Sequence, residues 1–100
     1  MKTLNQIGPM SKRTFLKISK SALLANAATM RKMAGDAKVV AVIKADAYGH
    51  GQNTVAKVLQ GSVDYFQVDS VDEAVRLRTV TKKPILIFGY VIERELPAAL

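Results

Sequence analysis

The sequence predicts an α/β fold built on a parallel β-sheet. Three short runs of β-branched and aliphatic residues begin at Lys38, Tyr65 and Ile85. Segments with a helical spacing of apolar residues lie between these runs. Strands that alternate with helices are joined by right-handed crossovers and therefore run parallel. This alternation is typical of a (β/α) barrel or of a doubly wound sheet.

The amino-terminal end is predicted to precede the domain. Residues 1–12 include a glycine and a proline among polar neighbours and show no apolar period, which indicates a flexible basic arm. Residues 13–100 form the predicted domain. Within it, Phe15 to Ile18 are expected to make a short extended segment before the first helix.

The first helix is predicted to begin at Ser19 or Ser21, because either hydroxyl can accept a hydrogen bond from a free backbone N–H. Gly35 is expected to end it. The following run, Lys38–Ile43, has no polar alternation and predicts a strand that is buried on both faces. The apolar residues of the helix recur at intervals of four, three and four, at Leu23, Ala27, Met30 and Ala34.

The second βα unit begins with a glycine-bearing loop over Ala45–Gly51. Asn53 is placed to cap a second helix, and Gly61 is placed to end it. Tyr65–Val68 is then predicted to form the second strand. The glycines of the loop permit backbone conformations that other residues resist.

The third unit carries a specific helix-start signal. Ser70 and Glu73 match the capping box, in which each side chain binds a backbone N–H of the other residue. The helix is expected to continue to Arg78. Pro84 then introduces Ile85–Phe88 as the third strand.

The composition limits the classes of function. The chain has no cysteine and one histidine, and its carboxylates are dispersed, so no disulfide and no metal site are predicted. No apolar run approaches the roughly 18 residues that cross a bilayer, so no membrane anchor is expected. A reducing compartment, by default the cytoplasm, is compatible with the lack of cysteine.

The net charge of +7 is unevenly distributed. Residues 1–35 hold seven basic residues and no acidic one, whereas eight of each occur from Asp36 onward. A nucleic-acid-binding arm and an organelle transit peptide both have such a bias. However, the basic residues are spread at helical intervals without the aromatic or arginine clusters of base recognition. We therefore favour a solvated helix face, and nucleic acid is not an expected partner.

Lys44 follows the first predicted strand directly. In a (β/α) barrel this position lies at the carboxyl-terminal face, where reacting groups gather. Position alone is more typical of a surface lysine that begins a loop. Tyr48, four residues on, offers a hydroxyl to a bound group. For His50 and Asp46 we favour hydrogen bonds that shape the loop over a catalytic role and over a role in orienting Lys44, respectively.

The segment Val39–Gly51, VVAVIKADAYGHG, resembles the pyridoxal 5′-phosphate attachment signature of alanine racemases. Ile18–Asn26 resembles the start of the first helix of that family, and Val68–Ala74 resembles the stretch after its second strand. The similarity covers about residues 14–90. The chain departs from the family pattern outside the signature, at Ser19, Ser21, Gln67 and Asp69.

The resemblance implies a fold-type III enzyme whose amino-terminal part is a (β/α)8 TIM barrel, with about three βα units present here. Lys44 matches the lysine that holds the cofactor as a Schiff base and exchanges the α-proton on the D-face. Tyr48 matches the tyrosine whose hydroxyl binds the cofactor phosphate. The implied reaction interconverts L-alanine and D-alanine, which supplies D-alanine for peptidoglycan, and the implied enzyme is a homodimer.

Racemisation also requires a base on the opposite face of the substrate. In the family this base is a tyrosine of the carboxyl-terminal domain of the partner subunit, and no segment before Leu100 matches it. Tyr65 and Tyr90 are interpreted as packing or rim residues. A closed barrel takes about 250 residues, so the chain is expected to be truncated and inactive by itself. A broad-specificity amino-acid racemase and a non-catalytic remnant are the alternatives.

Overall fold

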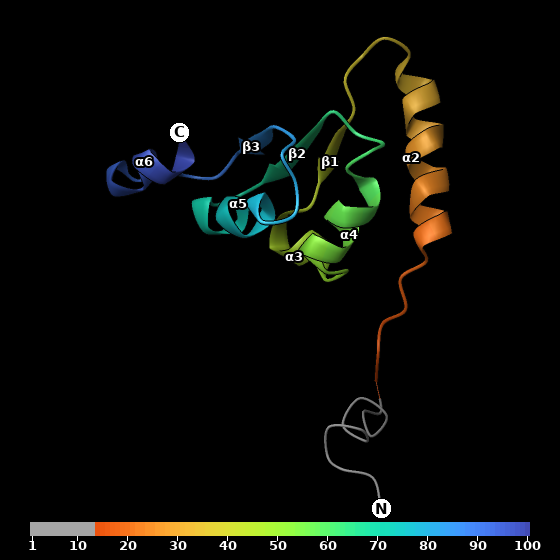
Figure 1. Ribbon diagram of the computed structural model, residues 1–100, viewed down its shortest axis with the longest axis horizontal. Helices are drawn as coiled ribbons and strands as arrows, with labels where there is room; N and C mark the ends of the chain where they lie inside the picture. The colour runs from red at the N-terminus through yellow and green to blue at the C-terminus, as the bar shows by residue number, and fades with distance from the viewer. Residues whose placement is uncertain (1–13) are drawn as a thin grey trace, which may run out of the picture.

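The computed structural model describes residues 14–100, so the arm predicted at residues 1–12 lies outside the described part. Figure 1 shows a small sheet with helices along it. The elements in chain order are α2 (Lys20–Ala34), β1 (Val40–Val42), α3 (Lys44–Tyr48), α4 (Gln52–Leu59), β2 (Tyr65–Val68), α5 (Val71–Arg78), β3 (Ile85–Ile87), the 3-10 helix η1 (Glu93–Glu95) and α6 (Leu96–Ala99).

The three strands form one parallel sheet in the order β1-β2-β3 (Figure 1). Val40 of β1 pairs with Tyr65 of β2, and Phe66 of β2 pairs with Ile85 of β3. Right-handed crossovers in this order place α4 and α5 on the same face of the sheet. The predicted α/β fold is confirmed. The order β1-β2-β3 fits the start of a TIM barrel, in which each strand pairs with the next one along the chain.

The core lies between the sheet and its helices. Phe66 and Val68 are fully buried in one cluster with apolar residues of α2, α4 and α5. The other face of the sheet is open within residues 14–100, where Val42 is 39% exposed and Leu86 is 41% exposed. The prediction that the first strand is buried on both faces is therefore wrong for this chain by itself. No described element covers the second face.

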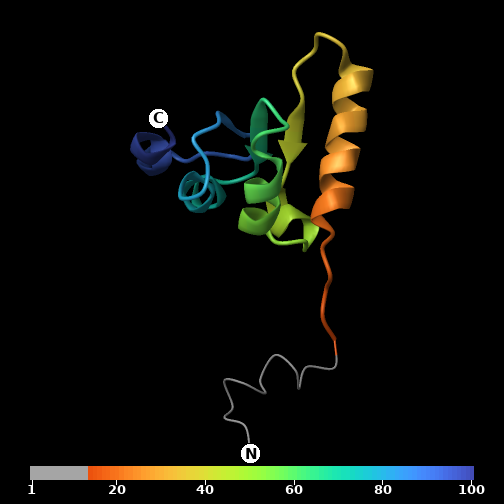
Figure 2. The same cartoon turned by 45° about the vertical axis from the view of Figure 1, so that its right-hand side comes forward.

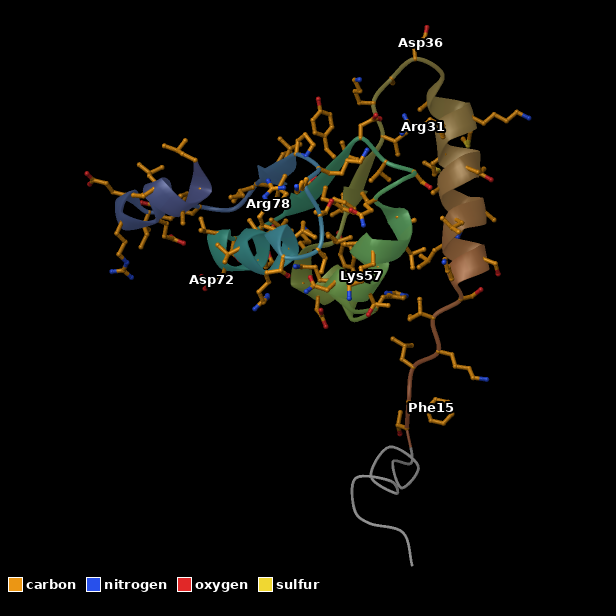
Figure 3. All side chains as sticks on the ribbon, in the orientation of Figure 1. Phe15, Arg31, Asp36, Lys57, Asp72 and Arg78 are labelled. Carbon is orange, nitrogen blue, oxygen red and sulfur yellow. The ribbon has the colours of Figure 1, made fainter. Side chains whose placement is uncertain are left out.

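Helix α2 begins and ends at the predicted positions. The Ser19 hydroxyl accepts a hydrogen bond from the N–H of Ala22 at 3.1 Å, and Gly35 ends the helix with a φ of 60°. Its predicted apolar face is only partly correct, because Ala27 is buried but Met30 is exposed. The helix instead directs Arg31 towards the sheet, as Figure 3 shows. None of the helices within residues 14–100 has both the length and the apolar character that are needed to span a bilayer.

Strand β1 covers only the middle of its predicted run, Lys38–Ile43, and the boundaries after it agree with the sequence to within one residue except at α4. The second strand coincides with its prediction, and the capping box of Ser70 and Glu73 is present at the start of α5. Asn53 was expected to cap the second helix, but the cap position is Gly51, two residues earlier, and α4 begins at Gln52. The physical reason is a carboxylate from the preceding turn, Asp46, which takes over the capping.

Candidate active site at the carboxyl ends of the strands

Lys44 stands where the sheet ends. Its neighbour Ile43 is 2% exposed and anchors the chain in the core, whereas the Lys44 side chain is 36% exposed. The Nζ atom lies 3.7 Å from Oδ2 of Asp69, the residue that follows β2. Parallel strands bring their carboxyl ends to one edge, so residues 25 positions apart in the chain become an ion pair.

Helix α3, directly after Lys44, is a left-handed turn. The φ angles of Ala45, Asp46, Ala47 and Tyr48 lie between 50° and 57°. Figures 1 and 2 show it between the end of β1 and the start of α4. This conformation costs roughly 1–2 kcal/mol for each residue with a side chain. The predicted role of the glycines is confirmed, since φ is 91° at Gly49 and 96° at Gly51. The four consecutive non-glycine residues with positive φ were not predicted.

Backbone and side-chain hydrogen bonds hold this turn. The N–H of Ala47 donates to the carbonyl of Ile43 at 2.8 Å, and the N–H of Gly51 donates to the carbonyl of Asp46 at 2.9 Å. The Asp46 carboxylate accepts the N–H of Gln52 at 2.8 Å, which caps α4. The predicted turn-holding role of Asp46 is confirmed.

Glu73 ties the turn to the end of β2. Its Oε1 accepts the N–H groups of Asp69 at 2.8 Å and Ser70 at 3.0 Å, and its Oε2 accepts the N–H of Ala45 at 2.7 Å. Burial pushes the pKa of Glu73 up, but these backbone hydrogen bonds outweigh it and hold the pKa below its usual value. The local capping box was predictable from the sequence, but the bond to Ala45 was not, because nothing in the pattern signals a partner 28 residues away.

The signature contains two residues with ring side chains, His50 and Tyr48, which differ in exposure and in contacts. His50 Nδ1 lies 2.9 Å from the carbonyl of Ala47, a hydrogen-bond distance that confirms its predicted role in shaping the loop. Tyr48 is 62% exposed at the end of the left-handed turn. The structure thus brings Lys44 and Asp69 together and presents Tyr48 on the same turn.

The end of β3 reaches the same edge. A side-chain carbon at Gly89 would lie 1.7 Å from the carbonyl oxygen of Asp69, so the backbone of the third strand passes directly against that residue. Tyr90, interpreted from the sequence as a rim residue, is exposed. Residues 14–100 contain no cluster of three or more histidine, cysteine, aspartate or glutamate side chains that would suit a metal ion.

Residues 18–100 match the family described as "Alanine racemase, N-terminal domain". The alanine racemase of Francisella philomiragia is 42% identical over 76 residues, which are 76% of this chain and 21% of that protein. The serine/alanine racemase of Enterococcus gallinarum is 46% identical over 82 residues, which are 79% of this chain and 12% of that protein.

Solved structures agree with the sequence relatives. An alanine racemase from Bartonella henselae with covalently bound pyridoxal phosphate superposes with a TM-score of 0.72 at 31% identity. The match covers 82% of this chain and 24% of that protein. The chain therefore spans about a quarter or less of the length of these relatives.

Proposed function

This chain belongs to the alanine racemase family, and we propose that it forms the amino-terminal part of an alanine racemase that binds pyridoxal 5′-phosphate through Lys44. The position of Lys44 carries the proposal. Its amine stands at the carboxyl end of β1, partly exposed, beside Asp69 at the end of β2. The covalently bound cofactor of the Bartonella henselae relative supports the choice of cofactor.

The residues around Lys44 fit an aldehyde cofactor that carries a phosphate. The 3.7 Å contact with Asp69 is a weak ion pair between partly exposed groups, so the amine can be redirected to a carbonyl carbon. Tyr48 presents an exposed hydroxyl on the turn that begins at Lys44, and a hydroxyl donor suits a phosphate. Both side chains belong to one rigidly hydrogen-bonded segment.

The chemistry divides between the cofactor and the protein. When bound, pyridoxal 5′-phosphate supplies an electron sink for negative charge at the substrate Cα. The task of Lys44 is then to exchange the α-proton at its Nζ atom from one face of the substrate, and the task of Tyr48 is to orient the phosphate. We place the base for the opposite face outside these 100 residues.

The proposal extends to the whole enzyme. Residues 13–100 contribute part of a barrel domain to a cytoplasmic homodimer that converts L-alanine and D-alanine into each other for peptidoglycan synthesis. The relative named serine/alanine racemase favours one alternative, a racemase with broader substrate range. The substrate pocket of such an enzyme includes residues outside this chain, so the two candidates share the Lys44 site.

Trapping of the cofactor tests the proposal. The chain is incubated with a low concentration of pyridoxal 5′-phosphate, reduced with borohydride, and mapped by peptide mass spectrometry. We expect the pyridoxyl adduct on Lys44, and we expect Lys44→Ala to abolish it. Lys57→Ala, which removes an exposed lysine of α4 (Figure 3), is the control and should leave the adduct unchanged.

Two results would contradict the assignment. Adducts scattered over the lysines of the parent chain would show that Lys44 has no binding pocket, and the chain would then be a non-catalytic remnant. An undiminished total adduct on Lys44→Ala would show that another amine binds the cofactor.

A further inference from the structure

The second carboxylate oxygen of Glu73 has no role in capping its own helix. A capping box uses one acceptor for the N–H at the helix start, and Oε1 fulfils this role with its bonds to Asp69 and Ser70. Oε2 instead accepts the N–H of Ala45, the direct neighbour of Lys44 and the first residue of the left-handed turn. The side chain therefore bridges the ends of two strands.

We propose that Glu73 is a positioning residue that holds the left-handed turn against α5 and thereby fixes where the Lys44 amine stands. The effect on Lys44 rests on the proposed function, whereas the effect on the turn does not. In this role Glu73 acts through its hydrogen bond to Ala45 and does not touch the cofactor or the substrate.

The strain in the turn gives this contact its importance. Four consecutive non-glycine residues with positive φ persist only where the surroundings hold them, because each of them prefers another conformation. A hydrogen bond to an ionised carboxylate is about twice as strong as one between neutral groups. The lowered pKa of Glu73 keeps this carboxylate ionised at neutral pH.

Helix α5 also holds the far end of the turn. Gln52, the first residue of α4, is 3% exposed, and its side-chain Nε2 donates to the backbone carbonyl of Glu73 at 3.1 Å. The N–H of Gln52 donates in turn to Asp46. Glu73 therefore binds the first residue of the turn through its side chain and the first residue of α4 through its backbone carbonyl.

The variant Glu73→Gln removes the hydrogen bond to Ala45 while it keeps the capping bond to Ser70. Glutamine serves at this position of a capping box, since its amide oxygen accepts a backbone N–H. Its amide nitrogen is a donor and cannot accept the N–H of Ala45. Ser70→Ala is the matched local control, because it removes the hydroxyl that accepts the Glu73 N–H and leaves the Ala45 bond in place. Asp72→Asn, an exposed residue of α5 (Figure 3), controls for the loss of one negative charge.

Two measurements are made on each variant of the full chain. Hydrogen exchange followed by NMR reports the protection of the amides of Ala47 and Gly51, which the turn provides. Borohydride trapping reports the fraction of pyridoxyl label on Lys44 relative to the other lysines. We expect Glu73→Gln to speed the exchange of these amides by about tenfold or more, from the loss of one charged hydrogen bond, and to lower the labelled fraction on Lys44. Neither control should do so.

The outcomes distinguish this inference from the proposed function. Unchanged amide exchange in Glu73→Gln, or an equal effect of Ser70→Ala, overturns the inference. Faster exchange in Glu73→Gln alone supports it, even if the parent chain shows no preference for Lys44. That lack of preference would contradict only the cofactor assignment.

Discussion

Tyr48 is the residue whose role depends most directly on one atom. Its hydroxyl is exposed at the end of the left-handed turn, and its ring makes no part of the buried core. A change that removes only the oxygen therefore tests the proposed phosphate contact without disturbing the packing.

We predict that Tyr48→Phe weakens retention of pyridoxal 5′-phosphate about tenfold or more, because a hydrogen bond to a charged group contributes about 1.5–3 kcal/mol. Lys44 should still be labelled at high cofactor concentration. Equilibrium dialysis measures the retention. Tyr90→Phe, which removes an exposed hydroxyl after β3, is the control. Equal retention by parent and Tyr48→Phe would remove the phosphate role from Tyr48.

Gly89 is constrained by space, not by backbone angles. Its missing side chain leaves room for the carbonyl oxygen of Asp69, which a Cβ atom would meet at 1.7 Å. Gly61, by contrast, has open space around the position of a Cβ atom. The two glycines make a matched pair for a test of how closely the strand ends approach.

We predict that Gly89→Ala lowers the free energy of unfolding by about 1–3 kcal/mol, since backbone must move to relieve the overlap. Gly61→Ala should change it by less than about 0.5 kcal/mol. Urea denaturation followed by circular dichroism measures both. Similar values for the two variants would mean that the end of β3 does not pack against Asp69.

At the scale of elements, one cluster of charged and polar contacts joins α2 to the strand that follows it. The Arg31 guanidinium binds the Asp64 carboxylate at 2.7 Å and the carbonyl of Ser62 at 3.1 Å. Asp64 also accepts the N–H of Val39 at 2.7 Å, just before β1. The hydrogen bond from Arg31, followed by that from Val39, lowers the pKa of Asp64 below its ordinary 3.8.

This lowered pKa predicts how stability depends on pH. A carboxyl group with a depressed folded-state pKa contributes stability that is complete above its unfolded-state value and is lost as the pH falls through the folded-state value. The contribution of Asp64 should therefore be complete well above pH 3.8 and be lost progressively as the pH falls below that value. In Asp64→Asn the corresponding part of the acid dependence should be missing. Urea denaturation at a series of pH values measures it.

The control for this prediction is Asp36→Asn, at the exposed turn after α2 (Figure 3). It should keep the acid dependence of the parent chain. If Asp64→Asn also kept it, the tie between α2 and β1 would not depend on the Asp64 charge.

Single elements show why local patterns succeed for some segments and fail for others. The capping box at Ser70 and the helix end at Gly35 were predictable, because each depends on residues within a few positions. The cap of α4 was not, since it comes from Asp46 across a folded turn. The left-handed turn itself has no local signal beyond the glycines that follow it, and alanine and tyrosine do not favour that conformation.

At the scale of the whole molecule, the sheet has one covered and one open face. The helices bury the face that carries Phe66 and Val68, while Val42 and Leu86 stay exposed on the other. A closed barrel fills such an inner face with side chains from all its strands. This chain spans about a quarter or less of the length of its racemase relatives.

The sequence by itself determined the alternation of strands and helices, the parallel sense of the sheet and the position of Lys44 after the first strand, because these follow from local periodicity and from the handedness of crossovers. It also carried the signature that identifies the family. Only the tertiary structure decided which groups meet Lys44. Asp69 and Glu73 reach the neighbourhood of Lys44 because parallel strands end at one edge, and such contacts between distant residues leave no periodic trace in the chain.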